Sequence, residues 1–102
     1  MLSDSRCLSS LCLVLLILSG CAKPPELGSD EASRAAESLY TAVTSKRDDL
    51  LTQTESQINT LRSGQKLSEQ AHAELTDIIR VARDGNWQPA AERLDALIRA
   101  QP

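Results

Sequence analysis

The spacing of apolar side chains is the feature that most constrains the fold of this 102-residue chain. From about residue 30 to residue 100, Leu, Ile, Val and Ala recur mostly three, four or seven positions apart, as one face of a helix requires. There is no Phe, one Trp and one Tyr, and no run of alternating β-branched residues that would indicate strands. Good helix formers (Ala, Leu, Glu, Arg and Gln) dominate this region, so the sequence predicts an all-α domain over residues 30–102.

A long first helix is predicted over residues 30–63. Ser29 or Asp30 would cap its N-terminus, and Gly64 would take the left-handed position after its last turn. Its expected apolar stripe consists of Ala32, Ala36, Leu39, Val43, Leu50, Thr54, Ile58 and Leu61. Leucines recur within this stripe every 11 residues, a period that keeps a helical stripe nearly straight.

The weak helix formers Thr41, Thr44 and Ser45 make a break near residue 45 an alternative to one continuous helix. A continuous helix of about 30 residues would measure roughly 45 Å, longer than either of its partners, so it would protrude or bend.

Two shorter helices are predicted over residues 68–84 and 87–100. Ser68 would open the first, Gly85 would end it, and Asn86 would cap the second. Their expected inner faces consist of Leu67, Ala71, Leu75, Ile78, Ile79 and Ala82, and of Ala90, Ala91, Leu94, Leu97 and Ile98. Three helices joined by short turns predict a small three-helix bundle or a helical hairpin array.

A core of about 70 residues rich in Ala is small, which leaves two oligomeric states open. The domain is either a self-sufficient monomer, or it gains stability from self-association or from a partner. In the second case the first helix would offer an exposed apolar stripe. The residues predicted to pack or to contact a partner are Leu39, Val43, Leu50, Ile58 and Trp87.

The N-terminus carries a short apolar block, residues 11–18, followed by Leu18-Ser19-Gly20-Cys21. The block is too short to span a membrane, which takes about 20 apolar residues, but it suits the apolar region of a signal peptide. The tetrapeptide resembles the lipobox of bacterial lipoproteins. The alternatives are an ordinary secretory peptide or a short buried helix that ends in Cys.

The lipoprotein resemblance implies that residues 1–20 are a signal peptide cleaved between Gly20 and Cys21. Cys21 would then carry a diacylglyceryl thioether, often with a further acyl chain such as palmitate on its amine, and several chains anchor a protein stably to a membrane. In the enterobacterial sorting pattern an Asp after the Cys retains the protein at the inner membrane. Ala22 stands there in this chain, so the resemblance favours the periplasmic face of the outer membrane, if the organism has two membranes.

The chain has three cysteines, Cys7, Cys12 and Cys21, and cleavage would remove the first two. The sulfur of the remaining one would hold lipid, so no thiol of the mature chain would serve redox or metal chemistry. Residues 21–29, which include Pro24 and Pro25, are predicted to form a flexible, extended tether that holds the helical domain off the membrane.

Residues 85–102 carry a second, partial resemblance. The spacing of Gly85, Trp87, Ala90, Leu94 and Pro102 resembles the second half of a tetratricopeptide repeat. The first half departs from the motif, with Glu74, Asp77 and Ile78 where it has Trp, Leu and Gly. The alternative is a generic helical hairpin with the same turn chemistry, and both predict that Trp87 packs over the 68–84 helix.

Candidate catalytic residues are sparse, and we expect a protein that is not an enzyme and needs no cofactor or metal. His72 is the only histidine, and adjacent Asp48 and Asp49 would point about 100° apart on a helix. No P-loop, dinucleotide fingerprint, nucleophile elbow or Ser-x-x-Lys motif is present. Removal of residues 1–20 takes one basic and one acidic side chain, so 10 basic and 13 acidic ones remain, and a net charge of −3 disfavours nucleic-acid binding.

Two classes of function remain. The first is a membrane-anchored structural or adaptor lipoprotein that binds another envelope protein through a helical face. The alternative is a small-ligand-binding or inhibitor lipoprotein whose helices enclose a pocket around Trp87 and Tyr40.

Overall fold

The computed structural model describes residues 24–102, which fold into four helices. These are α2 (Asp30–Thr44), α3 (Asp48–Ser63), α4 (Glu69–Arg83) and α5 (Trp87–Arg99). The described part of the chain contains no strand, so the predicted all-α fold class is confirmed. The number of helices differs from the expectation, because two of them occupy the range predicted for one.

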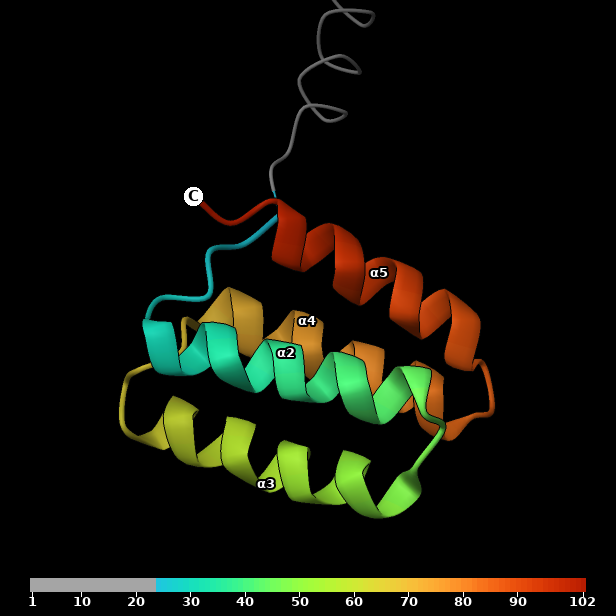
Figure 1. Cartoon of the computed structure of the whole chain (residues 1–102). Helices are drawn as coiled ribbons and strands as arrows, with labels where there is room; N and C mark the ends of the chain where they lie inside the picture. The colour runs from blue at the N-terminus through green and yellow to red at the C-terminus, as the bar shows by residue number, and fades with distance from the viewer. Residues whose placement is uncertain (1–23) are drawn as a thin grey trace, which may run out of the picture.

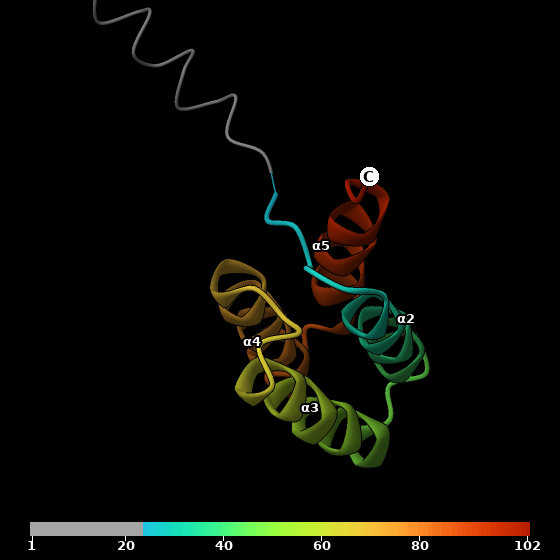
Figure 2. The same ribbon diagram turned by 90° about the vertical axis from the view of Figure 1, so that its left-hand side faces the viewer.

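The four helices form a closed ring in which each helix runs antiparallel to the next (Figure 1). Helix α2 packs against α3 and α5, and α4 packs against the same two neighbours. The view along the bundle shows the ring in the order α2, α3, α4, α5, with α5 returning to α2 (Figure 2). This is an up-down-up-down four-helix bundle.

The expected 30–63 helix is broken at residues 45–47, as the weak helix formers there allowed. Thr44 Oγ1 donates to the Tyr40 carbonyl at 2.8 Å, and Ser45 Oγ donates to the Thr41 carbonyl at 2.6 Å. Such bonds compete with continuation of the helix. The chain then reverses through Lys46, so that α3 folds back along α2.

All three turns between helices share one backbone geometry. After α2, the Lys46 amide donates to Val43 O and the Arg47 amide to Ala42 O, which is the Schellman pattern. The same pair of bonds closes the turns at residues 64–66 and 84–86. The left-handed residues of the three turns are Lys46 (φ 55°), Gln65 (φ 60°) and Gly85 (φ 89°).

Two serines cap the helices that run away from the same end of the bundle. Ser29 Oγ accepts the Ala32 amide and Ser68 Oγ accepts the Ala71 amide, both at 3.1 Å. Of the two candidates for the first cap, Ser29 is the one observed, and the predicted cap at Ser68 is confirmed. Asn86 precedes α5 without a capping bond from its side chain. The prediction for Gly64 was wrong, because Gly64 has a helix-like φ of −83° and Gln65 takes the left-handed position.

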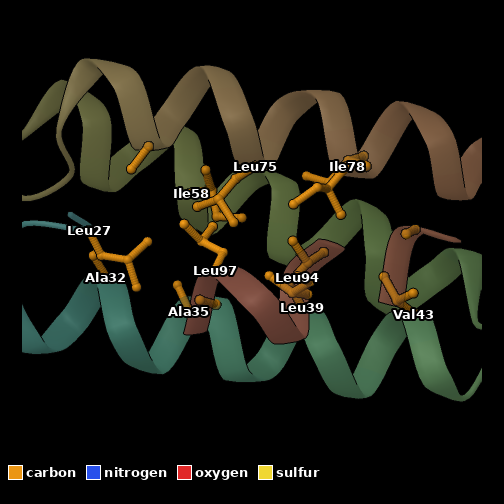
Figure 3. Packing of buried hydrophobic residues seen from close by; sticks show 14 of the residues in the cluster. Leu27, Ala32, Ala35, Leu39, Val43, Ile58, Leu75, Ile78, Leu94 and Leu97 are labelled. Atoms are coloured by element: carbon orange, nitrogen blue, oxygen red, sulfur yellow. The ribbon is translucent and has the colours of Figure 1, made fainter. Parts of the chain in front are cut away.

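The core lies along the axis of the ring and draws on every helix (Figure 3). The faces predicted for α4 and α5 are buried or half-buried as expected. On α3 the register differs: Leu51 is buried with Thr54 and Ile58, while Leu50 is only half-buried. The break resets the helical phase, so the 11-residue leucine period does not continue as one stripe.

Residues 25–29 lie across the end of the bundle, against the α3–α4 turn. The Ser68 amide donates to Leu27 O at 3.1 Å, and Ser68 Oγ donates to Glu26 O at 2.6 Å. Ser29 Oγ donates in turn to Lys66 O at 2.6 Å. Each capping serine thus also holds the stretch of chain that precedes the other.

Gln101, near the C-terminus, also bonds to this N-terminal stretch. The Leu27 amide donates to Gln101 Oε1 at 2.9 Å, and Gln101 Nε2 donates to Pro25 O at 3.1 Å. Leu27 is 1% exposed and belongs to the same core cluster as Ala32 and Leu97 (Figure 3). We call residues 25–29, 66–68 and Gln101 the N-terminal clasp.

The clasp corrects the prediction of a flexible tether for residues 25–29, while residues 21–23 of the predicted tether lie outside the described residues. Residues 25–29 belong to the folded domain, because their carbonyls and amides are bonded to the α3–α4 turn and to Gln101. The periodicity of the helices carries no sign of this, since Leu27 precedes the first cap. Among the described residues, no helix is both long and apolar enough to cross a membrane.

Ion pairs bridge the helices on the outside of the ring. Arg83 of α4 forms a bidentate pair with Glu55 of α3 at 2.9 Å, and Arg93 of α5 bonds Glu74 and Asp77 of α4. These pairs are solvent-exposed, so each contributes little to the free energy of unfolding.

Candidate binding pocket at the end of the bundle

An open pocket of about 430 Å³ lies at the end of the bundle opposite the clasp. Its lining residues lie in or beside the α2–α3 and α4–α5 turns. Both turns are at the right-hand end of the ribbon in Figure 1. Its lining consists of Val43, Thr44, Lys46, Gly85, Asn86, Trp87, Gln88, Pro89 and Ala91.

The apolar part of the pocket comes from α2 and from the first turn of α5. Val43 is buried in the core, and Trp87 and Ala91 are half-buried and pack against that core. Gly85 has a φ of +89°, which a residue with a Cβ rarely adopts, and it turns the chain so that Trp87 begins α5. Pro89 fits the first turn, where its missing amide costs little.

The polar part of the pocket is basic. Lys46 is exposed and is the one charged residue in the lining. The N-terminus of α5 also faces this region, and its partial positive charge has no acidic residue in the first turn to offset it. An apolar side chain beside a carboxylate is the chemistry that this combination accommodates best.

Of the five residues predicted to pack or to contact a partner, Leu39, Val43 and Ile58 belong to the core and Trp87 packs against it, while Leu50 lies apart. Leu39 and Ile58 are buried in the core, and Val43 lies beneath the pocket. Leu50 is half-buried and lines a second, more polar hollow of about 270 Å³ between α2 and α3. Trp87 alone combines partial exposure with a place in the apolar pocket.

The exposed apolar stripe that belonged to the partner-dependent alternative does not form, because the break folds that stripe into the bundle. Of the large hydrophobic side chains between residues 24 and 102, Tyr40 is the one that is exposed, at 37%. Tyr40 is absent from the lining around Trp87, so the pocket around both aromatic residues that belonged to the ligand-binding alternative does not form.

Sequence reasoning missed Lys46, Asn86 and Gln88 as pocket residues. Each lies in or beside a turn, and turn composition does indicate exposed polar positions. The spacing of residues along the chain does not show that the turn at residue 46 comes to lie beside the turn at residue 86 in the folded molecule.

The residues considered for catalysis occupy ordinary surface positions. His72 bonds Asn59 of α3 through Nε2 and Oδ1 at 2.9 Å, which links α4 to α3. Asp49 pairs with Arg47 at 2.6 Å, and the hydrogen bond from that guanidinium lowers the pKa of the Asp49 carboxyl. Within residues 24–102 no group of three or more His, Cys, Asp or Glu side chains is placed to hold a metal ion.

Gly20 and Cys21, the predicted cleavage and lipidation residues, lie outside the described residues, as does the whole predicted signal peptide. The lipobox resemblance therefore stays a prediction. The resemblance of residues 85–102 to half of a tetratricopeptide repeat also stays a prediction, because no comparison tests it. No protein-family model, curated protein or solved structure matches this chain.

Proposed function

We propose that this chain is a small lipoprotein, anchored through lipid on Cys21, that acts as an adaptor for another protein of the cell envelope. The anchor rests on the apolar block and the Leu18-Ser19-Gly20-Cys21 motif. With Ala22 after the cysteine, the periplasmic face of the outer membrane is the proposed location in an organism with two membranes.

The observation that carries the adaptor role is the Trp87 pocket. The described helices bury their apolar faces in one another, so they leave little apolar surface for a broad interface. A half-buried Trp in an open pocket is the kind of anchor point on which small interfaces concentrate their binding energy. We propose that a partner inserts an apolar side chain there and places an acidic group near Lys46.

Photo-crosslinking in living cells tests this role. A photoreactive amino acid at Gln88 lies in the pocket, and the same amino acid at Gln70 lies exposed near the clasp and serves as the matched control. We expect position 88 to crosslink to one envelope protein, Lys46→Glu to weaken that crosslink, and position 70 to give none. Equal crosslinking from both positions, or no effect of Lys46→Glu, contradicts an adaptor that uses this pocket.

A small-ligand-binding role is the second candidate, favoured by the volume of the pocket, which falls within the range of about 300–1,000 Å³ for such sites. Trp87 is the only Trp and reports directly on occupancy. A saturable change in its fluorescence on addition of a metabolite extract with protein removed would favour this second role.

A further inference from the structure

The clasp limits how far the folded domain can stand from a lipid attached at Cys21. Pro25 is held through its carbonyl by Gln101, and Leu27 is buried in the core. The first fixed position therefore comes only four residues after Cys21. Even fully extended, four residues span at most about 14 Å.

We infer that the clasp end of the bundle lies against the lipid headgroups, and that the Trp87 pocket is presented away from the membrane. This inference rests on the proposed lipid anchor and adds an orientation to it. The pocket lies at the other end of helices of about 15 residues, so it is roughly 20 Å from the clasp along the bundle. In the inferred orientation it is therefore farther from the membrane than the clasp by about that distance.

The surface of the described helices favours this end-on contact over one along the side of the bundle. A helix that lies flat in a membrane interface needs a continuous apolar face. The apolar faces here point into the ring, and Tyr40 is the exposed large hydrophobic residue of the described part. The sides of the bundle carry ion pairs instead.

Electrostatic attraction is not what holds the clasp end at the lipid. Its exposed charges are mixed, with Glu26, Asp30 and Glu69 beside Lys66 and Arg99. Because mixed charges give no strong attraction to an anionic surface, we expect the orientation to be insensitive to salt. The short chain between Cys21 and Pro25 is the proposed restraint.

Trp fluorescence of the lipidated full-length product in vesicles tests the orientation, with nitroxide-labelled headgroups as quencher. The natural Trp87 reports on the pocket end. The pair Lys66→Trp with Trp87→Phe moves the only Trp to the clasp, and Glu69→Trp with Trp87→Phe provides a second clasp position. Circular dichroism confirms that each variant is folded.

We expect strong loss of fluorescence from Trp at position 66 or 69 and little loss at position 87, at low and at high salt. A flexible Gly-Ser insertion after Ala22 should abolish the difference. Equal quenching at both ends, or no effect of the insertion, overturns the orientation while leaving the anchor intact. If instead Cys21→Ala binds vesicles as well as the natural sequence does, the proposed anchor fails, and the orientation fails with it.

Discussion

At the scale of single residues, two of the three turns place a residue with a Cβ in the left-handed conformation that favours glycine. Three turns require a left-handed residue, yet only the α4–α5 turn supplies glycine, at Gly85. The other two place Lys46 and Gln65 in that conformation, which costs a residue with a Cβ roughly 1 kcal/mol. In the α3–α4 turn the glycine stands one position early, at Gly64.

Gln65→Gly should therefore raise the free energy of unfolding by about 0.5 kcal/mol, since relief of the left-handed strain is partly offset by the entropy of glycine in the unfolded chain. Gly85→Ala should lower it by about 1 kcal/mol for the converse reason. Gly64→Ala is the control: its Cβ would lie 3.6 Å from Thr60 O, an ordinary contact. Urea denaturation followed by circular dichroism measures all three, and destabilisation by Gln65→Gly would show that the turn needs the Gln side chain.

Leu27 tests whether the clasp belongs to the fold. It is buried in the core and lies three residues before α2. Leu27→Ala should lower the free energy of unfolding by about 2–4 kcal/mol, the usual cost of an emptied leucine site. Pro24→Ala, at the exposed residue directly before the clasp, should change the free energy of unfolding little. If the two variants unfold at the same urea concentration, residues 25–29 are not held as described.

At the scale of elements, much of the fold could be predicted from the sequence. The helical spacing predicted α4 and α5 to within one residue at each end. The capping rules identified Ser68 and gave Ser29 as one of two candidates. Of the two alternatives for residues 30–63, the broken helix is the one that forms, because the local bonds of Thr44 and Ser45 end α2. A single apolar pattern spans the break, so the pattern alone did not decide between them. Leu51 was missed for the same reason, since α3 takes its own phase after the turn.

The pairing of α4 with α5 predicts a dependence on pH. Hydrogen bonds from Arg93 and, to a smaller extent, from Arg80 lower the pKa of the Asp77 carboxyl. A pKa lower in the folded than in the unfolded chain stabilises the fold above the ordinary Asp value of about 3.9, and this contribution is lost as the pH falls through the folded pKa.

Asp77→Asn should therefore flatten the loss of stability with falling pH. We expect the urea midpoints of the natural chain to drop more steeply than those of Asp77→Asn between about pH 5 and about pH 2. At neutral pH the variant should be slightly less stable, because Arg93 keeps Glu74 but loses Asp77. Parallel curves for the two proteins in the acid range would show that the Asp77 pairs do not form in solution.

At the scale of the whole molecule, the features that matter for function are the ones that spacing along the chain cannot show. Closure of the ring brings α5 back to α2, and this brings the turn at Lys46 beside Trp87. The same closure brings Gln101 to Leu27 and fastens the N-terminal segment. The Trp87 pocket and the clasp thus occupy opposite ends of one bundle, which gives the proposed adaptor a membrane end and a partner end.

The proposed anchor is the claim on which the rest of this arrangement depends, and the mass of the mature N-terminus tests it most directly. The protein would be purified from the membranes of a lipoprotein-processing bacterium and its N-terminal peptide analysed by mass spectrometry. We expect a chain that begins at Cys21 and carries a diacylglyceryl group on sulfur, and a Cys21→Ala variant that is neither lipidated nor retained in the membrane. A chain that still begins at Met1, or that begins at Cys21 with a free thiol, would contradict the proposed anchor.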